Sequence, residues 1–360
     1  MRPILQIFTA AAMLLPGIAL AQATQKLTAG KSNEYGLIYT LPLTALDITI
    51  EAEHVVKKPG EFYKYALKYL NTQPVTQPSE TWDIKSVIVN PRGVADSERR
   101  YLMQFKSGSS PYIIVNEENL PLAINTTAIP ADTLQAIPRP VAPQPTPLET
   151  PAARQAVTEE MLQSQSTAKR AELAAAQIYA LRQSRTDLIT GQADQMPPDG
   201  KAMQLILDNI AAQEAALTAM FLGTEQRSTV VETVTVTPDE EVSDQVIARL
   251  SALDGIVDAD DLTGDPLYLS VSIEEQGEMP VNEKGEEKKF PKGGVAYCIP
   301  GTANVDITYR GRTLYDATLP FAQYGVIFGL DPSMFTDKKA PAYLLLNPST
   351  GAIRELGTVQ

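Results

Sequence analysis

Two stretches, GLIYTLPLTALDIT at residues 36–49 and GVAYCIPGTANVDIT at residues 294–308, decide the interpretation of the fold because they resemble each other. Gly, Tyr, Pro, Thr and the run Asp-Ile-Thr recur in the same order, with one residue inserted in the second stretch. Each stretch predicts a strand, a proline that forces a break or an edge position, and a second strand.

The similarity extends beyond these two stretches. The further matches, in order and type, are Phe62 with Phe321, Tyr65 with Tyr324 and Ala66 with Gly325. Each copy then spans roughly 35 residues, as a supersecondary unit does. We interpret the similarity as an internal duplication that gives two related β-rich subdomains about a pseudo-twofold axis. The alternative is chance similarity between two β hairpins.

Together with the spacing of apolar residues in the rest of the chain, the two copies predict an α+β protein in which a helical hairpin is inserted between the two related β-rich subdomains. The predicted segments are a signal peptide at 1–21, an N-terminal β-rich subdomain at 22–128, a Pro-rich linker at 129–151, an antiparallel helical hairpin at 152–226 and a C-terminal β-rich subdomain at 227–360. Short helices are also predicted for GEFYKYALKYL at 60–70 and for the acidic run at 239–256.

The hairpin is predicted from two apolar stripes at helical spacing, over 152–190 and 200–222. Gly191 can end the first helix and Asp199 can cap the second. An antiparallel register would place Asp208 opposite Arg182, as an ion pair that specifies the fold. Arg182 and Arg185 together could alternatively bind a carboxylate or phosphate ligand.

The N-terminus predicts export. Arg2 precedes an apolar run, and Ala-Leu-Ala at 19–21 fits a signal-peptidase site. Pro16 and Gly17 interrupt the run, so we expect no transmembrane anchor. The predicted location is the periplasm or the cell surface of a Gram-negative bacterium.

Composition restricts the partners. The formal net charge of -13 disfavours nucleic acid, because affinity for phosphate backbones depends on Lys and Arg. Cys298 is the one cysteine in the sequence, so no internal disulfide forms, and we expect a buried structural thiol. Its alternative is a reactive nucleophile.

Catalytic residues are few in this sequence. His54 is its one histidine, which rules out a site built from several histidines, and we expect it to be a core or surface residue. A hydrolase that acts on glycans would need only two carboxylates, so this alternative stays open. Against it, one Trp and 6% aromatic residues leave few surfaces on which sugar rings stack.

The run DADDLTGD contains the densest group of acids. Its oxygen ligands for a calcium ion would come from Asp258, Asp260, Asp261 and Asp265. The spacing departs from an EF-hand loop, since Leu262 occupies a ligand position. The alternative is a solvated turn whose Asp residues cap backbone donors. No other cofactor is predicted.

Several motifs together resemble a family of exported Bacteroidetes proteins known only as a domain of unknown function. They are YGLIYTLP, PGEFYKYALKYL, IYALRQSRTDLITGQADQMPPDGKAM, VDADDLTGDPLYLSV, and the late GVAYCIP with PFAQYGV. The resemblance implies an exported globular protein and carries no catalytic residues.

We therefore predict a non-catalytic binding or scaffold protein of the cell envelope, with a protein partner bound through the helical hairpin. The two alternatives are the carboxylate-dependent hydrolase and a calcium-stabilised adhesive module.

Overall fold

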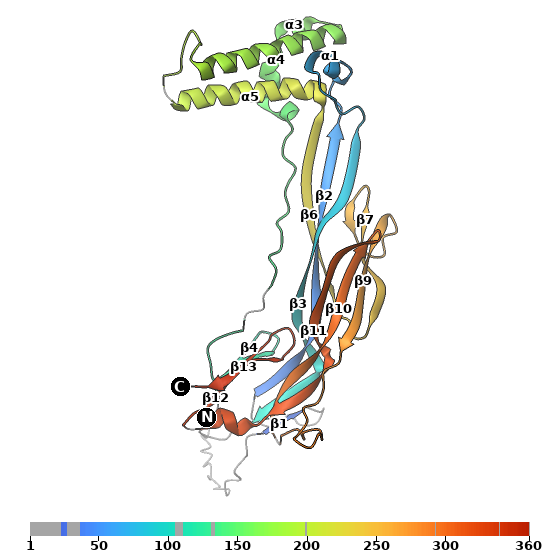
Figure 1. Ribbon diagram of the computed structural model, residues 1–360, viewed down its shortest axis with the longest axis vertical. Helices are drawn as coiled ribbons and strands as arrows, with labels where there is room; N and C mark the ends of the chain where they lie inside the picture. Colours follow the sequence, from blue (N-terminus) through green and yellow to red (C-terminus); the bar gives the residue numbers. More distant parts are fainter. Residues whose placement is uncertain are drawn as a thin grey trace, which may run out of the picture.

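The computed structural model describes residues 23–26, 37–104, 111–130, 134–198, 200–291, 293–337 and 339–359. The molecule is elongated, with helices at one end and the described ends of the chain near the other (Figure 1). It combines sheets and helices, which confirms the α+β class. The predicted signal peptide lies outside the described residues.

The first sheet is built from very long strands. Its order is β1-β3-β2-β6, with bounds β1 Ala23–Lys26, β2 Leu37–Lys58, β3 Ser79–Gln104 and β6 Thr224–Val236. All neighbouring strands are antiparallel. The ends of β2, β3 and β6 extend past the second sheet and connect to the helices (Figure 1).

The second sheet packs on the lower part of the first. Its order is β11-β10-β9-β7-β8, with bounds β7 Val242–Ser251, β8 Gly255–Val257, β9 Gly264–Glu275, β10 Val295–Tyr309 and β11 Arg312–Leu330. Alternate residues of β2, from Leu46 to Ala52, face the core between the two sheets and are fully buried. This spacing follows from the two-residue period of a strand.

A small third sheet lies near the described ends of the chain. Its order is β13-β12-β5-β4, with bounds β4 Ile113–Val115, β5 Pro121–Ile124, β12 Ala342–Leu346 and β13 Ile353–Thr358, and the short helix η3 (Pro332–Thr336) precedes it. Its turn is buried between the two larger sheets: Thr44 donates to Ser349 O at 3.0 Å, and Cys298 N donates to Gly351 O at 3.0 Å.

The sheets do not divide at the predicted subdomain boundaries. β2 pairs with β6 over its upper half, and β5 pairs with β12. Strands from both predicted β-rich subdomains therefore share two of the three sheets, which neither subdomain could form alone.

The two similar stretches do form equivalent strands. β2 and β10 each lie between two partners, β3 and β6 for one, β11 and β9 for the other. In both hairpins the register breaks next to the proline. In the β2–β3 hairpin the pairing jumps from Thr40–Arg100 to Pro42–Ala95. In the β10–β11 hairpin it jumps from Ile299–Val326 to Gly301–Phe321. At each jump one unpaired residue lies opposite four unpaired residues of the partner strand.

The predicted extension of the duplication is wrong. Phe62, Tyr65 and Ala66 lie at the helical end of the molecule, whereas Phe321, Tyr324 and Gly325 lie in β11. The register instead aligns residues 96–99 of β3 with 322–325 of β11.

All described helices except η3 form a separate unit, the helical head, at the end of the long strands (Figure 1). It contains η1 (Tyr63–Tyr65), α1 (Ala66–Leu70), η2 (Pro147–Glu149), α2 (Pro151–Ala156), α3 (Glu159–Gln163), α4 (Thr167–Thr190) and α5 (Gly200–Leu222). Its own core includes Phe62, Met161, Ile178, Leu217 and Phe221. The short helix predicted in 60–70 is thus confirmed as η1 and α1.

The predicted second helix is confirmed at both ends, but the first is divided into α2, α3 and α4. The breaks have local causes, because Thr158 and Ser166 have extended backbones and their side chains cap Met161 N and Lys169 N. Gly191 ends α4 at φ 74°, as predicted. Asp199, the predicted cap, lies outside the described residues.

The helix predicted at 239–256 is wrong, because this segment forms β7 and β8. A register shift between Val246 and Ala248 lets the adjacent Ile247 and Ala248 both be buried, with Leu250. Such a bulge in a strand produces apolar spacing that imitates a helix.

The linker contains no helix or strand over 134–146, apart from a single bridge in which Val141 and Thr229 exchange backbone hydrogen bonds of 3.2 and 2.9 Å. It then enters the helical head through η2. This bridge holds the linker against the outer edge of β6.

Candidate functional site

An ion-pair cluster on the helical head contains both predicted arginines. Arg182 Nε donates to Glu214 Oε1 at 2.6 Å, and Arg185 Nη1 lies 3.1 Å from Glu214 Oε2. The arginines are one turn apart on α4 and face α5, so one carboxylate reaches both. The Glu214 side chain is 13% exposed, whereas each arginine side chain is 42% exposed.

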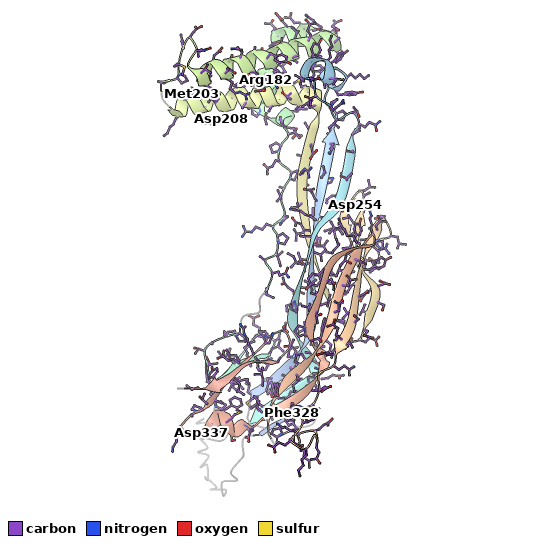
Figure 2. All side chains as sticks on the ribbon, in the orientation of Figure 1. Arg182, Met203, Asp208, Asp254, Phe328 and Asp337 are labelled. Carbon is purple, nitrogen blue, oxygen red and sulfur yellow. The ribbon has the colours of Figure 1, made fainter. Side chains whose placement is uncertain are left out.

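The predicted pairing of Arg182 with Asp208 is wrong. Asp208 Oδ1 accepts from Gln204 on the same helix at 2.7 Å. Figure 2 labels Arg182 on α4 and Asp208 on α5. The partner, Glu214, lies six residues later on α5. Glu214 was not singled out in the sequence, although its spacing from Leu217 and Phe221 places it near the apolar stripe.

A cavity of about 450 Å³ lies beside this cluster. Its walls come from α4, α5 and η2, and include both arginines, Glu214, Pro147 and Leu222. Three alanines and Thr218 of α5 complete the apolar side. The head thus presents a positively charged edge next to a small apolar wall.

The turn end of the head is apolar and exposed. Ile189 is 65% exposed, Leu205 is 64% exposed and Met196 is 49% exposed. Among the described residues, α5 is the one helix long and apolar enough by composition to cross a membrane, and 22% of that segment is buried. A packed helix of a soluble protein passes the same test, so the finding establishes only that α5 exposes apolar surface.

The head is held on the strands by close backbone contacts. Phe62 N donates to Met220 O at 2.7 Å, and Val75 N donates to Leu222 O at 2.9 Å. Gly60 is buried with no room for a side chain, since a Cβ there would lie 2.5 Å from Ala219 O. This joint fixes the direction of the head relative to the strands.

The four predicted calcium ligands do not form one cluster. Asp258, Asp260 and Asp261 line an open cavity of about 650 Å³ together with Glu232, while Asp265 pairs with Arg310, whose Nε donates at 2.8 Å. In the part of the chain that the structure describes, no three acidic, His or Cys side chains are arranged to hold a metal.

Asp261 matches the alternative of a solvated turn. Its Oδ1 accepts from Thr263 N at 2.9 Å and from Thr263 Oγ1 at 2.7 Å, and these bonds lower the pKa of Asp261. Calcium binding stays a prediction without a preformed site.

His54 and Cys298 have structural surroundings. His54 Nε2 is 2.8 Å from Glu80 Oε1, and its ring stacks on Trp82 with centroids 4.2 Å apart. The stack closes the end of the sandwich, where Trp82 also contacts Gly255. Cys298 is buried, and burial raises the pKa of its thiol to about 11.

One close pair of acids is relevant to the hydrolase alternative. Asp306 faces Asp316 directly across β10 and β11, and burial together with the charges of Asp316 and Asp244 raises the pKa of Asp306. Asp306 alternates with the buried Val305 and Ile307, so it lies on the sheet face that points away from the core. A flat sheet face does not enclose a sugar chain as a glycosidase cleft does.

Comparison with known proteins gives one match. A family model described as a domain of unknown function (DUF4831) matches residues 35–354. No curated protein and no solved structure gives a significant match. The resemblance to a domain of unknown function is confirmed, while the bacterial group and the export stay predictions. Since the match spans most of the 360 residues, the chain belongs to the family described as Domain of unknown function (DUF4831).

Proposed function

We propose that the protein is an exported, non-catalytic binding component of the cell envelope whose helical head contacts a protein partner. The observation that carries this proposal is the exposed apolar surface at the turn end of α4 and α5, held far from the sandwich by the long strands β2, β3 and β6. Exposed apolar surface of this kind marks interaction sites more often than isolated side chains do.

Several features support a binding role. The head has its own core and its own cavity, and it contributes no strand to the three sheets. Residues on its outer face can therefore be substituted without disturbing the sandwich. The described surroundings of His54 and Cys298 are those of structural residues. Export rests on the predicted signal peptide at residues 1–21.

The test is a cross-linking pull-down from envelope fractions. Complete removal of 152–222 is a poor variant, because Phe62 and Ala66 pack against the removed helices and would be exposed. The better variant is Ile189→Asp with Leu205→Asp, which charges the exposed surface without touching the core.

The matched control is Leu253→Asp with Leu262→Asp, two leucines of the sandwich loops that are 80% and 82% exposed. We expect one defined cross-linked partner with the wild type and with the control, and its loss with the head variant. Capture that survives the head variant, or equal loss with the control, contradicts the proposal. So does a wild-type protein that captures nothing.

A further inference from the structure

The cluster on α4 and α5 has more positive than negative charge. Arg182 and Arg185 share the single carboxylate of Glu214, so the cluster carries a net charge of +1. It lies in a chain whose overall formal charge is -13. Glu214 Oε2 is buried and contacts Arg185 as an ion pair without a hydrogen bond.

Both guanidinium groups keep free donors. A guanidinium has five N–H donors. Among the described residues, Arg182 donates Nε to Glu214 and lies 5.7 Å from the ring centroid of Tyr179, and Arg185 places Nη1 3.1 Å from Glu214 Oε2 as an ion pair. The remaining N–H groups of two arginines, one helical turn apart, can bind a second carboxylate in the forked geometry that guanidinium groups favour.

The adjacent cavity suits an apolar body attached to that carboxylate. Its volume of about 450 Å³ lies within the usual range for ligand pockets, roughly 300–1,000 Å³. Ala211, Ala215 and Ala219 follow one another at one-turn spacing along its wall, with Leu222 beyond them. The two arginines thus come from α4, whereas the alanines and Glu214 come from α5.

We propose that this cavity binds a carboxylate carried on a short apolar body, with Arg182 and Arg185 as the carboxylate-binding residues. Glu214 acts as a positioning residue that holds both guanidinium groups in place, and it also competes with the ligand for their donors. This site is separate from the apolar surface at the turn, so either proposal can fail alone. The carboxylate can belong to a free alkyl acid or to the C-terminus of a peptide.

The experiment measures binding by calorimetry to the mature full-length protein. The probes are hexanoate and decanoate, hexylamine as the cationic counterpart, and an Ala-Leu-Leu tripeptide with a free or an amidated C-terminus. We expect an alkyl carboxylate or the free tripeptide to bind, and the amine and the amide to bind at least tenfold more weakly. Tighter binding of the acids or of the tripeptide identifies the source of the carboxylate.

Two substitutions should act in opposite directions. Arg185→Gln should weaken binding about tenfold or more, because it removes a charge-assisted hydrogen bond. Glu214→Gln should strengthen binding, because it raises the charge of the cluster and frees donors. Lys169→Gln is the matched control, since it removes a positive charge from the same helix 16 residues before Arg185, about 24 Å along the axis.

Circular dichroism at 222 nm checks that each variant keeps its helices. If Arg185→Gln loses them, Arg185→Lys replaces it, and it should weaken binding because Lys lacks the fork. The proposal is overturned if no carboxylate binds the wild type, if hexylamine binds equally well, or if Glu214→Gln in a folded protein weakens binding as Arg185→Gln does.

Discussion

Gly60 at the joint between head and strands provides a direct test of how the head is attached. A Cβ at this position would lie 2.5 Å from Ala219 O and closer still to Met220 O, both backbone atoms at the end of α5. Backbone cannot yield as a flexible side chain can, so Gly60→Ala must displace α5 or the start of η1. The hydrogen bond from Phe62 N to Met220 O, 2.7 Å long, is then strained or lost.

The expected cost follows from these contacts. Overpacking a close-packed site costs about 1–3 kcal/mol, and one lost backbone hydrogen bond costs about 1 kcal/mol more. We therefore expect a loss of about 2–4 kcal/mol in the free energy of unfolding of the head. With a urea slope of about 2 kcal/mol/M, the midpoint falls by about 1–2 M.

Two optical signals separate the head from the sandwich. The α-helices of the described chain all lie in the head, so circular dichroism at 222 nm follows the head. Trp82, the single Trp of the sequence, packs against the sandwich core, so its fluorescence follows the sandwich. In Gly60→Ala the helical signal should be lost at lower urea than the Trp82 signal.

The control is Gly200→Ala, the same substitution at the start of α5. A Cβ there meets nothing within 4 Å, so stability should be unchanged or higher by up to about 1 kcal/mol. The reasoning is refuted if Gly60→Ala leaves both transitions at their wild-type midpoints. It is also refuted if both transitions shift equally, because head and sandwich would then unfold as one unit.

Three further predictions concern the sandwich. Because the thiol pKa of Cys298 is about 11, its thiolate fraction at pH 8 is about one in a thousand. We expect a disulfide reagent to label Cys298 only after the protein unfolds. Rapid labelling of the folded protein would contradict the burial of this side chain. Burial raises the pKa of Glu51, but hydrogen bonds from Lys85 and Ser86 lower it more, so this carboxylate stabilises the fold above its unfolded pKa, and the stability is lost as the pH falls through the folded pKa. Lys85→Met should therefore lower the urea midpoint at neutral pH and change it much less in acid; an equal shift at both pH values would contradict this role. Thr44→Val removes a fully buried hydroxyl between the two β hairpins and should lower the free energy of unfolding, followed by Trp82 fluorescence, by about 2 kcal/mol, whereas Thr44→Ser should nearly restore it. Equal urea midpoints for the two variants would exclude the hydrogen bonds as the cause.

Local signals in the sequence explain which helices could be predicted. α5 was predicted at both bounds, and Gly191 at the end of α4, because capping and helical spacing are determined by neighbouring residues. β7 was mistaken for a helix because its bulge buries Ile247 and Ala248 side by side, and a bulge depends on pairing with β9, about twenty residues away. Long-range pairing overrode the local pattern there.

The same distinction applies to the candidate site. The sequence indicated Arg182 and Arg185 as a pair near an apolar stripe, because one helical turn separates them. The sequence did not identify Glu214, because the acid of α5 that meets the two arginines depends on the axial offset between α4 and α5. The core that joins α4 and α5 also includes Phe62, which comes from a segment about a hundred residues earlier, so this packing is not local.

The matched register breaks give the similarity of the two β hairpins a physical meaning. The residue that faces four residues of the partner strand is Leu41, just before Pro42, in β2, and Pro300 itself in β10. The four residues are 96–99 in β3 and 322–325 in β11. The two four-residue segments meet, since Arg99 Nη1 donates to Ala322 O at 3.1 Å. Proline lacks the N–H that continues a ladder, so it favours a break at the same place in both hairpins. The similarity therefore includes the contact between the two larger sheets, where the repeated proline lies at the break, whereas the repeated Tyr, Asp and Ile residues pair regularly along the ladders.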